Sequence, residues 1–243
     1  MCGRFILIQD AISLKNRFRA EIPEQLDLKP SCNISPGQKS PIITGDRHRE
    51  IHLFRFGLIP SWSQKSMLLI NARSEGDQNP TDDPSFTGGM GIFDKPAFRK
   101  PIRSQRCLVP ADAYIEGTTS EKLGKPFLIY LRNKVRPFAF AGIWDSWSHP
   151  ETGELIHSFA ILTTFPNQLV SLLPHHRMPV ILSREEEEKW LEEGFSREEL
   201  SLLMRPYPAE LMNGYPISSA IKNPKNNDPG LIQPAGPKIF AES

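Results

Sequence analysis

The sequence predicts an α+β protein, a single domain in which strands dominate and a few helices lie at the periphery. Of its 243 residues, 39% are hydrophobic, which is enough for a sizeable core at this length. Short apolar and aromatic runs bounded by Pro, Gly, Asn or Asp recur along most of the chain, a spacing typical of a mostly antiparallel sheet. Because the chain contains 23 prolines, turns and short strands are expected rather than long helices.

Five runs carry the strand prediction most clearly, because apolar and aromatic residues dominate each of them. The segment 106–117 adds a buried strand, a turn and a second short strand. Residues 73–98 are rich in Gly, Asp and Pro, so much of that segment is expected to be a surface loop. The five runs are IHLFRFGLIP (51–60), MLLINA (67–72), KPFLIYL (125–131), PFAFAGIW (137–144) and HSFAILTT (157–164).

Helices are expected in three places. Residues 11–18 have apolar side chains at helical spacing. The segments 183–193 and 196–204 each begin with Ser followed three residues later by Glu, which is the capping-box pattern. The glutamates at 185–188 are expected to form a solvated helix face. The Pro/Asn-rich segment 218–243 either wraps the body of the protein or is disordered.

Composition excludes several classes of protein. The formal charge of +1 gives no general case for nucleic-acid binding, so any basic surface must be local. No apolar run approaches the ~20 residues that span a bilayer, and no secretory signal is present. The three cysteines are too few for a disulfide framework, and no Cys/His spacing resembles a metal site. We therefore expect a soluble, intracellular monomer with no metal, no other cofactor and no membrane partner.

The chain begins MCGRF, so removal of Met1 leaves Cys2 with an α-amine and a thiol on one residue. The amine has a pKa near 7.7–8.0 against about 10.4 for lysine, so a far larger fraction is neutral and nucleophilic at pH 7. It can form an imine with an aldehyde, and the thiol can then close a five-membered thiazolidine ring. The alternative is a small buried hydrophobic residue near a terminus.

Other segments contain residue types suited to such chemistry. Asn71 and Arg73 fall on one side of a predicted strand, where an amide can hold a hydroxyl or amine and a guanidinium can bind phosphate. Glu116 lies near apolar neighbours, so desolvation could raise its pKa toward neutrality, as a general acid or base requires. The segment PHHRMPVIL (174–182) places two histidines in a proline-framed loop, where one could move protons or bind phosphate. Each also has a purely structural interpretation: a strand-end turn, a surface Glu or a rigid loop.

The segment KPAFRKPIRSQR (95–106) contains five basic residues and no acid, so it could follow a sugar-phosphate backbone. Trp62, Trp144 and Trp147 could stack on exposed bases, although a place in the core is the more frequent role of such residues. The basic residues of the segment are Lys95, Arg99, Lys100, Arg103 and Arg106.

Taken in order, several motifs resemble those of the SOS response-associated peptidase (SRAP) family. The resemblance runs from residue 2 to about 234, which predicts one domain over 2–234 and a C-terminal tail over 235–243. It departs from the family pattern at Gly117, Phe56 and His176, where the family usually has Trp, Trp and Asp. The motifs are MCGRF, NISPGQ (33–38), FGLIPSW (56–62), INARSE (70–75), RCLVPADAYIE (106–116), FAGIWDSW (140–147), SFAILTT (158–164), HHRMPVIL (175–182) and KNPKNNDPGLIQP (222–234).

The resemblance implies a barrel-like core, recognition of abasic sites in single-stranded DNA, and a thiazolidine link that shields the lesion. It also implies autocatalytic release of Met1 and a possible lyase-type activity, in the bacterial nucleoid or the eukaryotic nucleus according to the source. It assigns catalytic roles to Cys2, Asn71, Glu116 and His175. The residues expected to bind DNA, including two from the basic segment, are Arg4, Asn33, Pro36, Trp62, Arg73, Arg99, Arg103 and Arg177.

Two other functions remain compatible with the sequence. Cys2 could be the nucleophile of a hydrolase that cleaves peptides or amides, with its own amine as the base. The protein could also bind nucleic acid without forming a covalent bond. Partners at replication forks are not predicted by any motif.

Overall fold

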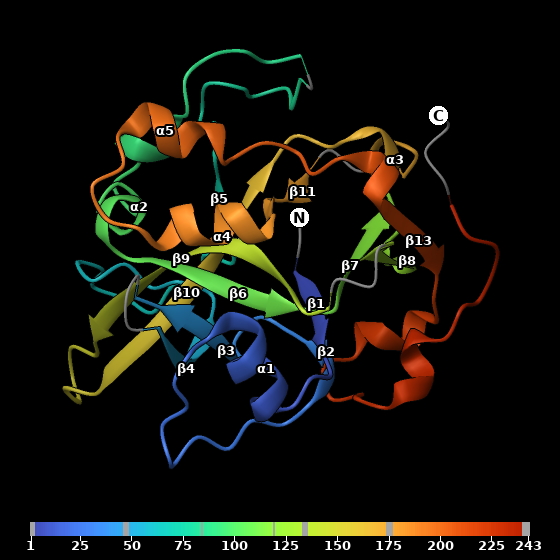
Figure 1. Cartoon of the computed structure of the whole chain (residues 1–243), viewed down its shortest axis with the longest axis horizontal. Helices are drawn as coiled ribbons and strands as arrows, with labels where there is room; N and C mark the ends of the chain where they lie inside the picture. The colour runs from blue at the N-terminus through green and yellow to red at the C-terminus, as the bar shows by residue number, and fades with distance from the viewer. Residues whose placement is uncertain are drawn as a thin grey trace.

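The computed structural model describes residues 3–45, 49–83, 85–118, 120–132, 136–173 and 177–239. It confirms the predicted α+β class, because strands form the centre and short helices lie around them (Figure 1). The strands are β1 (Arg4–Leu7), β2 (Ser31–Ile34), β3 (Lys39–Thr44), β4 (Glu50–Phe56), β5 (Asn71–Arg73), β6 (Arg106–Ala111), β7 (Ala113–Thr118), β8 (Lys122–Leu131), β9 (Phe138–Ser148), β10 (Leu155–Thr164), β11 (Met178–Pro179), β12 (Ile181–Leu182) and β13 (Met212–Pro216). The helices are α1 (Ala11–Phe18), α2 (Pro101–Ser104), α3 (Gln168–Ser171), α4 (Arg184–Leu191) and α5 (Arg197–Leu202), with 3-10 turns η1 (Gly91–Asp94), η2 (Ala209–Leu211), η3 (Ser219–Lys222) and η4 (Pro229–Ile232).

The larger sheet closes on itself as a barrel. Its strands follow the order β4, β3, β6, β9 and β10, and β10 pairs with β4 to complete the circle. Every pairing around the barrel is antiparallel except that between β10 and β4. The short strands β5 and β11 both pair with β10, while β12 pairs with β9. The barrel-like, mostly antiparallel core is therefore confirmed.

A second, antiparallel sheet packs beside the barrel in the order β13, β8, β7, β1 and β2. Because side chains alternate along a strand, this sheet has two buried faces. Phe5 and Leu7 of β1 belong to the main core, whereas Ile6 belongs to a smaller cluster with Ile221 and Leu231 from η3 and η4. The segment that could have been a disordered tail thus covers the outer face of this sheet as far as Ile232, and Ile239 then forms a bridge with Gly214 of β13.

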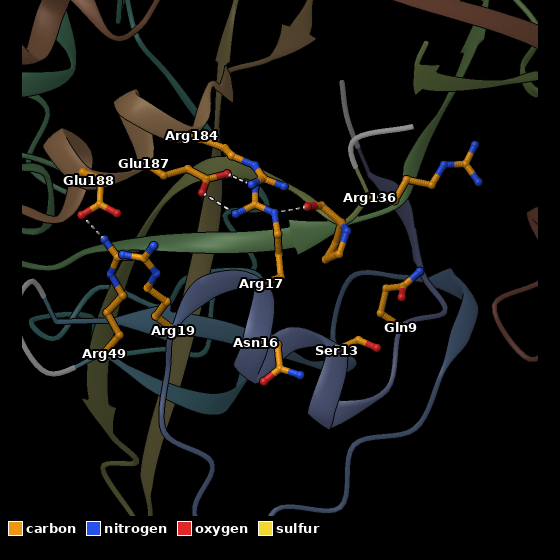
Figure 2. Close-up of a pocket in the computed structure, with 11 residues that line it drawn as sticks. Gln9, Ser13, Asn16, Arg17, Arg19, Arg49, Arg136, Arg184, Glu187 and Glu188 are labelled. Atoms are coloured by element: carbon orange, nitrogen blue, oxygen red, sulfur yellow. Dashed lines mark hydrogen bonds and ion pairs between the residues drawn. The ribbon is translucent and has the colours of Figure 1, made fainter. Parts of the chain in front are cut away.

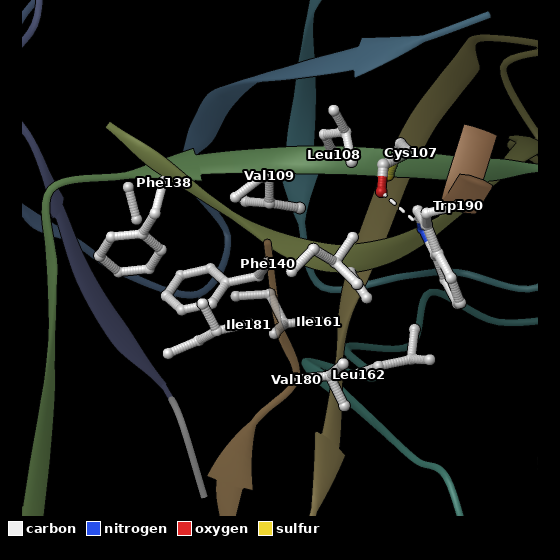
Figure 3. Packing of buried hydrophobic residues seen from close by; sticks show 14 of the residues in the cluster. Cys107, Leu108, Val109, Phe138, Phe140, Ile161, Leu162, Val180, Ile181 and Trp190 are labelled. Carbon is white, nitrogen blue, oxygen red and sulfur yellow. Dashed lines mark hydrogen bonds between the residues drawn. The ribbon is translucent and has the colours of Figure 1, made fainter. Parts of the chain in front are cut away.

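The main core fills the barrel and the space between the sheets. Figure 3 shows Val109, Phe140 and Ile161 from three barrel strands packed together. Helix α4 closes one side, since Trp190 is fully buried and its indole nitrogen donates to the Cys107 carbonyl at 3.0 Å. The buried aliphatic and aromatic area is the main source of the stability of such a domain.

The predicted helices are confirmed at α1, α4 and α5. Both predicted capping boxes form, with Ser183 and Ser196 as the N-caps of α4 and α5. The expectation of a solvated glutamate face is wrong at one position. Glu187 is 3% exposed and its carboxylate accepts two hydrogen bonds from Arg17 of α1, at 2.7 and 3.0 Å. An ion pair thus joins α4 to α1.

The predicted strands correspond to β4, β6, β7, β8, β9 and β10, and residues 73–98 contain little regular structure besides η1. The run 67–72 is a strand only at its end, because β5 begins at Asn71 and the preceding residues contribute a single bridge, Leu69 with Leu58. Among the described ranges, no helix has both the length and the hydropathy needed to cross a membrane.

Candidate functional site

Glu116 is the described residue whose environment most resembles that of an acid–base catalyst. It lies in β7, its backbone is paired with Phe127 of β8, and it is 2% exposed. Burial raises the pKa of Glu116 to about 7, although the chain's terminal amino group acts in the opposite direction. The predicted rise in its pKa is confirmed, and its carboxyl group can both donate and accept a proton near neutral pH.

Strand β1 lies beside this carboxyl group. The backbone of Arg4 is paired with Ile115, the neighbour of Glu116. The Arg4 guanidinium donates to the Asn33 side chain at 2.7 Å and to the carbonyls of Ile221 and Lys222 at 3.2 and 3.0 Å. Burial lowers the pKa of Arg4. Arg4 therefore fastens the N-terminal strand to the segment that follows β13.

Asn33 and Pro36 are two further residues that were expected to bind DNA. Asn33 lies in β2 beside Arg4, and Pro36 lies in the turn after β2. Asn33 is 1% exposed, and its amide donates to the backbone carbonyls of Ile221, Asn223 and Asn226 at 2.8–3.1 Å. Pro36 is half-buried in the turn between β2 and β3. In this structure the Asn33 side chain is thus a scaffold for residues 221–226.

A second group of predicted residues gathers around one end of β10. Asn71 and Arg73 of β5 pair with Ile161 and Thr163 on one edge of β10, and β11 pairs with the other edge. Both side chains are half-buried, and the Asn71 amide lies 3.5 Å from the Ile161 carbonyl. Strand β11 and the strand that carries Asn71 therefore lie on either side of β10.

Arg177 and Arg73 are brought together by acidic residues that the sequence interpretation left without a role. The Arg177 guanidinium donates to both carboxylate oxygens of Glu75, at 2.7 and 3.0 Å, and to the Thr163 carbonyl at 2.7 Å. Asp82 lies 3.1 Å from Arg177 and 2.9 Å from Arg73. Glu75 belongs to the INARSE motif, but its pairing with Arg177 could not be predicted from the residues around it, because Arg177 is 102 residues away.

The third group lies on the surface near α2. Trp62 is 57% exposed, and its indole nitrogen donates to the Pro96 carbonyl at 3.2 Å, beside the basic segment. Arg99 and Arg103 are exposed there. By contrast, Arg106 is buried, and its guanidinium donates to carbonyls of the chain, including Trp190 at 2.6 Å and Arg103 at 2.7 Å. Arg106 is therefore unavailable to a phosphate.

Burial excludes the stacking role considered for Trp147, which is 1% exposed and donates to the Ser63 carbonyl at 2.7 Å. Trp144 is half-buried and packs against the core, and its stacking role stays a prediction. The predictions for Cys2 and His175 lie outside the described residues. Among the described residues, no group of three His, Cys, Asp or Glu side chains is placed to hold a metal ion.

Gly117 stands where the resemblance leads one to expect Trp. A Cβ at this position would collide with the backbone carbonyl of Lys122, which belongs to the facing strand β8. The pairing register of β7 with β8 shifts between Gly117 and Thr118. The backbones of the two strands therefore approach each other closely at the residue after Glu116. The glycine is therefore required by this hairpin.

Comparison with known proteins agrees with this architecture. The family described as "SOS response associated peptidase (SRAP)" matches residues 1–224. The abasic site processing protein YoqW of Bacillus subtilis is 36% identical over 241 residues, which cover 96% of this chain and 99% of that protein. The abasic site processing protein HMCES of Pongo abelii is 30% identical over 285 residues, covering 96% of this chain and 76% of that protein.

A solved structure is also similar. The crystal structure of a protein from Bacteroides thetaiotaomicron superposes with a TM-score of 0.80 at 33% identity, covering 96% of this chain and 100% of that one. The match of the family over most of the chain and the identity to YoqW lead to one conclusion. This chain belongs to the SOS response associated peptidase (SRAP) family.

Proposed function

We propose that this protein processes abasic sites in single-stranded DNA by bonding to them covalently through Cys2. Its membership of the SRAP family and the names of its relatives, abasic site processing proteins, support the reaction class. The observation that carries the mechanism is the buried carboxyl group of Glu116, whose pKa of about 7 suits proton transfer and which stands beside the N-terminal strand.

Chain connectivity supports the pairing of Cys2 with Glu116. Two peptide units separate Cys2 from Arg4, so their Cα atoms are at most about 7 Å apart. Arg4 in turn faces Ile115 across an antiparallel pair, where Cα atoms are about 4.5–5.5 Å apart. Cys2 is thus only two residues from a strand that pairs beside Glu116, which supports a joint role for the two residues in this proposal.

The proposed reaction uses both nucleophiles of Cys2. The free amine adds to the aldehyde of the ring-opened sugar, and the carbinolamine loses water to give an imine. Protonated Glu116 donates to the departing hydroxyl group, and its carboxylate can accept the proton when the amine attacks. The thiol then adds to the imine carbon and closes the thiazolidine, a step favoured because both groups belong to one residue.

The remaining residues hold the substrate in this proposal. Asn71 positions the sugar or the amine, and His175 contacts phosphate and transfers protons. Trp62, Arg99 and Arg103 form an exposed platform beside which a single strand can lie, since aromatic faces stack on bases and guanidinium groups pair with phosphates. Arg4, Asn33, Pro36, Arg73 and Arg177 shape the walls of the site.

Removal of Met1 is the first step that this function requires, because the amine of Cys2 is otherwise part of a peptide bond. We infer that the protein removes Met1 itself, with the Cys2 thiol as nucleophile and Glu116 as the proton carrier. The family description as a peptidase supports this inference. A mass spectrum of the purified wild type and of Cys2→Ala tests it: only the wild type should lack Met1 when both are made without methionine aminopeptidase.

The adduct itself is tested by incubating the protein with a single-stranded oligonucleotide that carries one abasic site. We expect a protein–DNA band that survives denaturing electrophoresis in the wild type and in the control Cys32→Ala, and not in Cys2→Ala. Glu116→Gln should form it more slowly. An equally stable band from Cys2→Ala overturns the role of sulfur, and cleavage of a peptide panel without any adduct favours the hydrolase instead.

A further inference from the structure

The cleft between α1 and α4 carries an excess of positive charge that the proposed reaction does not use. It has a volume of about 650 Å³, within the ~300–1,000 Å³ typical of ligand sites. Its lining includes five arginines and two glutamates, an excess of three positive charges in a chain whose formal charge is +1. Figure 2 shows Arg17 at its centre with Arg184 beside it, while Arg136 lies on the side of Gln9 with its side chain directed away from Arg17.

Two of the arginines are already neutralised by the fold. Arg17 is paired with Glu187 at 2.7 Å, and its Nε donates to the Pro137 carbonyl at 2.9 Å. Arg49 is paired with Glu188 at 2.8 Å. These pairs fix the floor of the cleft and engage both of its carboxylates.

The other three arginines form no direct ion pair among the described residues, although Arg136 and Arg184 act electrostatically on Asp112 and Glu187. Arg19, Arg136 and Arg184 are exposed at the edges of the cleft, and Arg136 lies over the ring of Tyr130 at 5.6 Å. Like charges held around one cavity repel one another, and a bound anion relieves that repulsion. Guanidinium groups are especially suited to phosphate, which they bind through paired hydrogen bonds.

The lining also indicates which phosphate compound fits. Its uncharged residues are Gln9, Ser13, Asn16 and Pro137, so it contains hydrogen-bonding groups but no aromatic ring on which a base could stack. A free nucleotide would find no surface for its base. A DNA strand that presents only its phosphates to the cleft needs no aromatic ring there, because its bases point elsewhere.

The cleft lies at the far end of β1 from Arg4, because Gln9 follows that strand. Five residues of extended chain reach at most about 17 Å, which sets an upper limit on the distance along the chain between Arg4 and Gln9. We propose that this cleft is a second phosphate-binding site, which holds the DNA backbone several nucleotides from the lesion. The inference rests on the proposed function, since the strand is the one that Cys2 captures.

The test compares the wild type with the triple variant Arg19→Gln, Arg136→Gln, Arg184→Gln. A charge-matched control replaces three exposed residues outside the cleft, Lys15, Lys29 and Arg205, by Gln. Affinity for an undamaged, labelled 20-nucleotide single strand is measured by fluorescence anisotropy from 50 to 200 mM salt. Loss of three contacts should lower the salt slope by about two, so that the fall in affinity over this range shrinks roughly 15-fold.

Length separates this inference from the proposed function. A five-nucleotide strand with a central abasic site should crosslink equally to the wild type and to the triple variant, because it is too short to reach the cleft. If neither protein crosslinks, the proposed function fails. If both crosslink and the long strand shows the same salt slope with the wild type and the variant, the second site is wrong.

Titration with inorganic phosphate and with thymidine monophosphate distinguishes the source of the phosphate. We expect neither to bind the wild type measurably better than the triple variant. Binding of either compound that the triple variant loses, with the affinity for the long strand unchanged, overturns the assignment to a DNA strand. If the control variant lowers the salt slope of DNA affinity as much as the triple variant does, the second phosphate-binding site is also wrong, because the total charge of the protein would then explain the effect.

Discussion

Arg177 and Glu75 form a buried bidentate ion pair with nitrogen–oxygen distances of 2.7 and 3.0 Å, although they are 102 residues apart in sequence. Their side chains are 7% and 0% exposed. Arg177 directly precedes β11, so the pair anchors the start of that strand to the loop after β5. The pair therefore fixes Arg177 and the start of β11 relative to the segment after β5.

Breaking this pair should destabilise the protein strongly. Glu75→Gln leaves the Arg177 charge buried with reduced compensation, and losing one partner of a buried pair costs about 3–5 kcal/mol. For a domain of this size we expect the melting temperature to fall by roughly 10 °C. Glu121→Gln, which breaks the exposed pair with Lys125, is the control and should change it little. Equal melting temperatures for the two variants would contradict a structural role for the pair.

The pKa of Glu116 predicts how stability depends on pH. Its pKa is about 7 in the fold against 4.5 for an ordinary glutamate, so ionising it opposes folding. This cost is absent below about pH 4.5, grows as the pH rises, and is complete above about pH 7. Glu116→Gln should therefore stabilise the protein at pH 8 by up to about 3 kcal/mol relative to its effect at pH 4. Urea unfolding at both values measures this, and a difference that does not change with pH would refute it.

The three cysteines should differ in reactivity. Cys32 and Cys107 are 5% and 0% exposed, and burial raises the pKa of both thiols. Thiolate is the reactive form, so both should react slowly with a maleimide. We expect one thiol to react rapidly in the native protein, three after denaturation, and none rapidly in Cys2→Ala. Rapid native labelling of Cys107 would contradict this expectation.

Trp62 is expected to contribute to DNA affinity by stacking. Its exposed ring lies beside the basic segment, and stacking of one base on an aromatic residue is worth about 1–3 kcal/mol. Trp62→Ala should therefore weaken binding of an undamaged single strand about 5- to 150-fold in an anisotropy titration. Leu202→Ala, at an equally exposed apolar residue of α5, serves as the control. Unchanged affinity in Trp62→Ala would remove Trp62 from the DNA surface.

The sequence could predict features that depend on neighbouring residues, and it could not predict features that depend on residues far away in the chain. The N-terminal ends of α4 and α5 were predictable because a capping box lies within four residues. The rise in the pKa of Glu116 was predictable from its apolar neighbours. The inward position of Glu187 was not, because its partner Arg17 is 170 residues away. The parallel pairing of β10 with β4 and the burial of Arg106 likewise depend on distant segments.

Gly117 offers a test of the hairpin that follows Glu116. A side chain there meets the Lys122 carbonyl, and Lys122 itself has a left-handed backbone with φ of 50°. The facing strand cannot retreat without breaking its pairing with β7, so Gly117→Ala should cost about 1–3 kcal/mol. The melting temperature should fall by roughly 2–10 °C. Gly89→Ala, where a Cβ meets only the Gln78 side chain at 3.4 Å, is the control. If both variants melt like the wild type, the hairpin tolerates a side chain and the glycine is not required by packing.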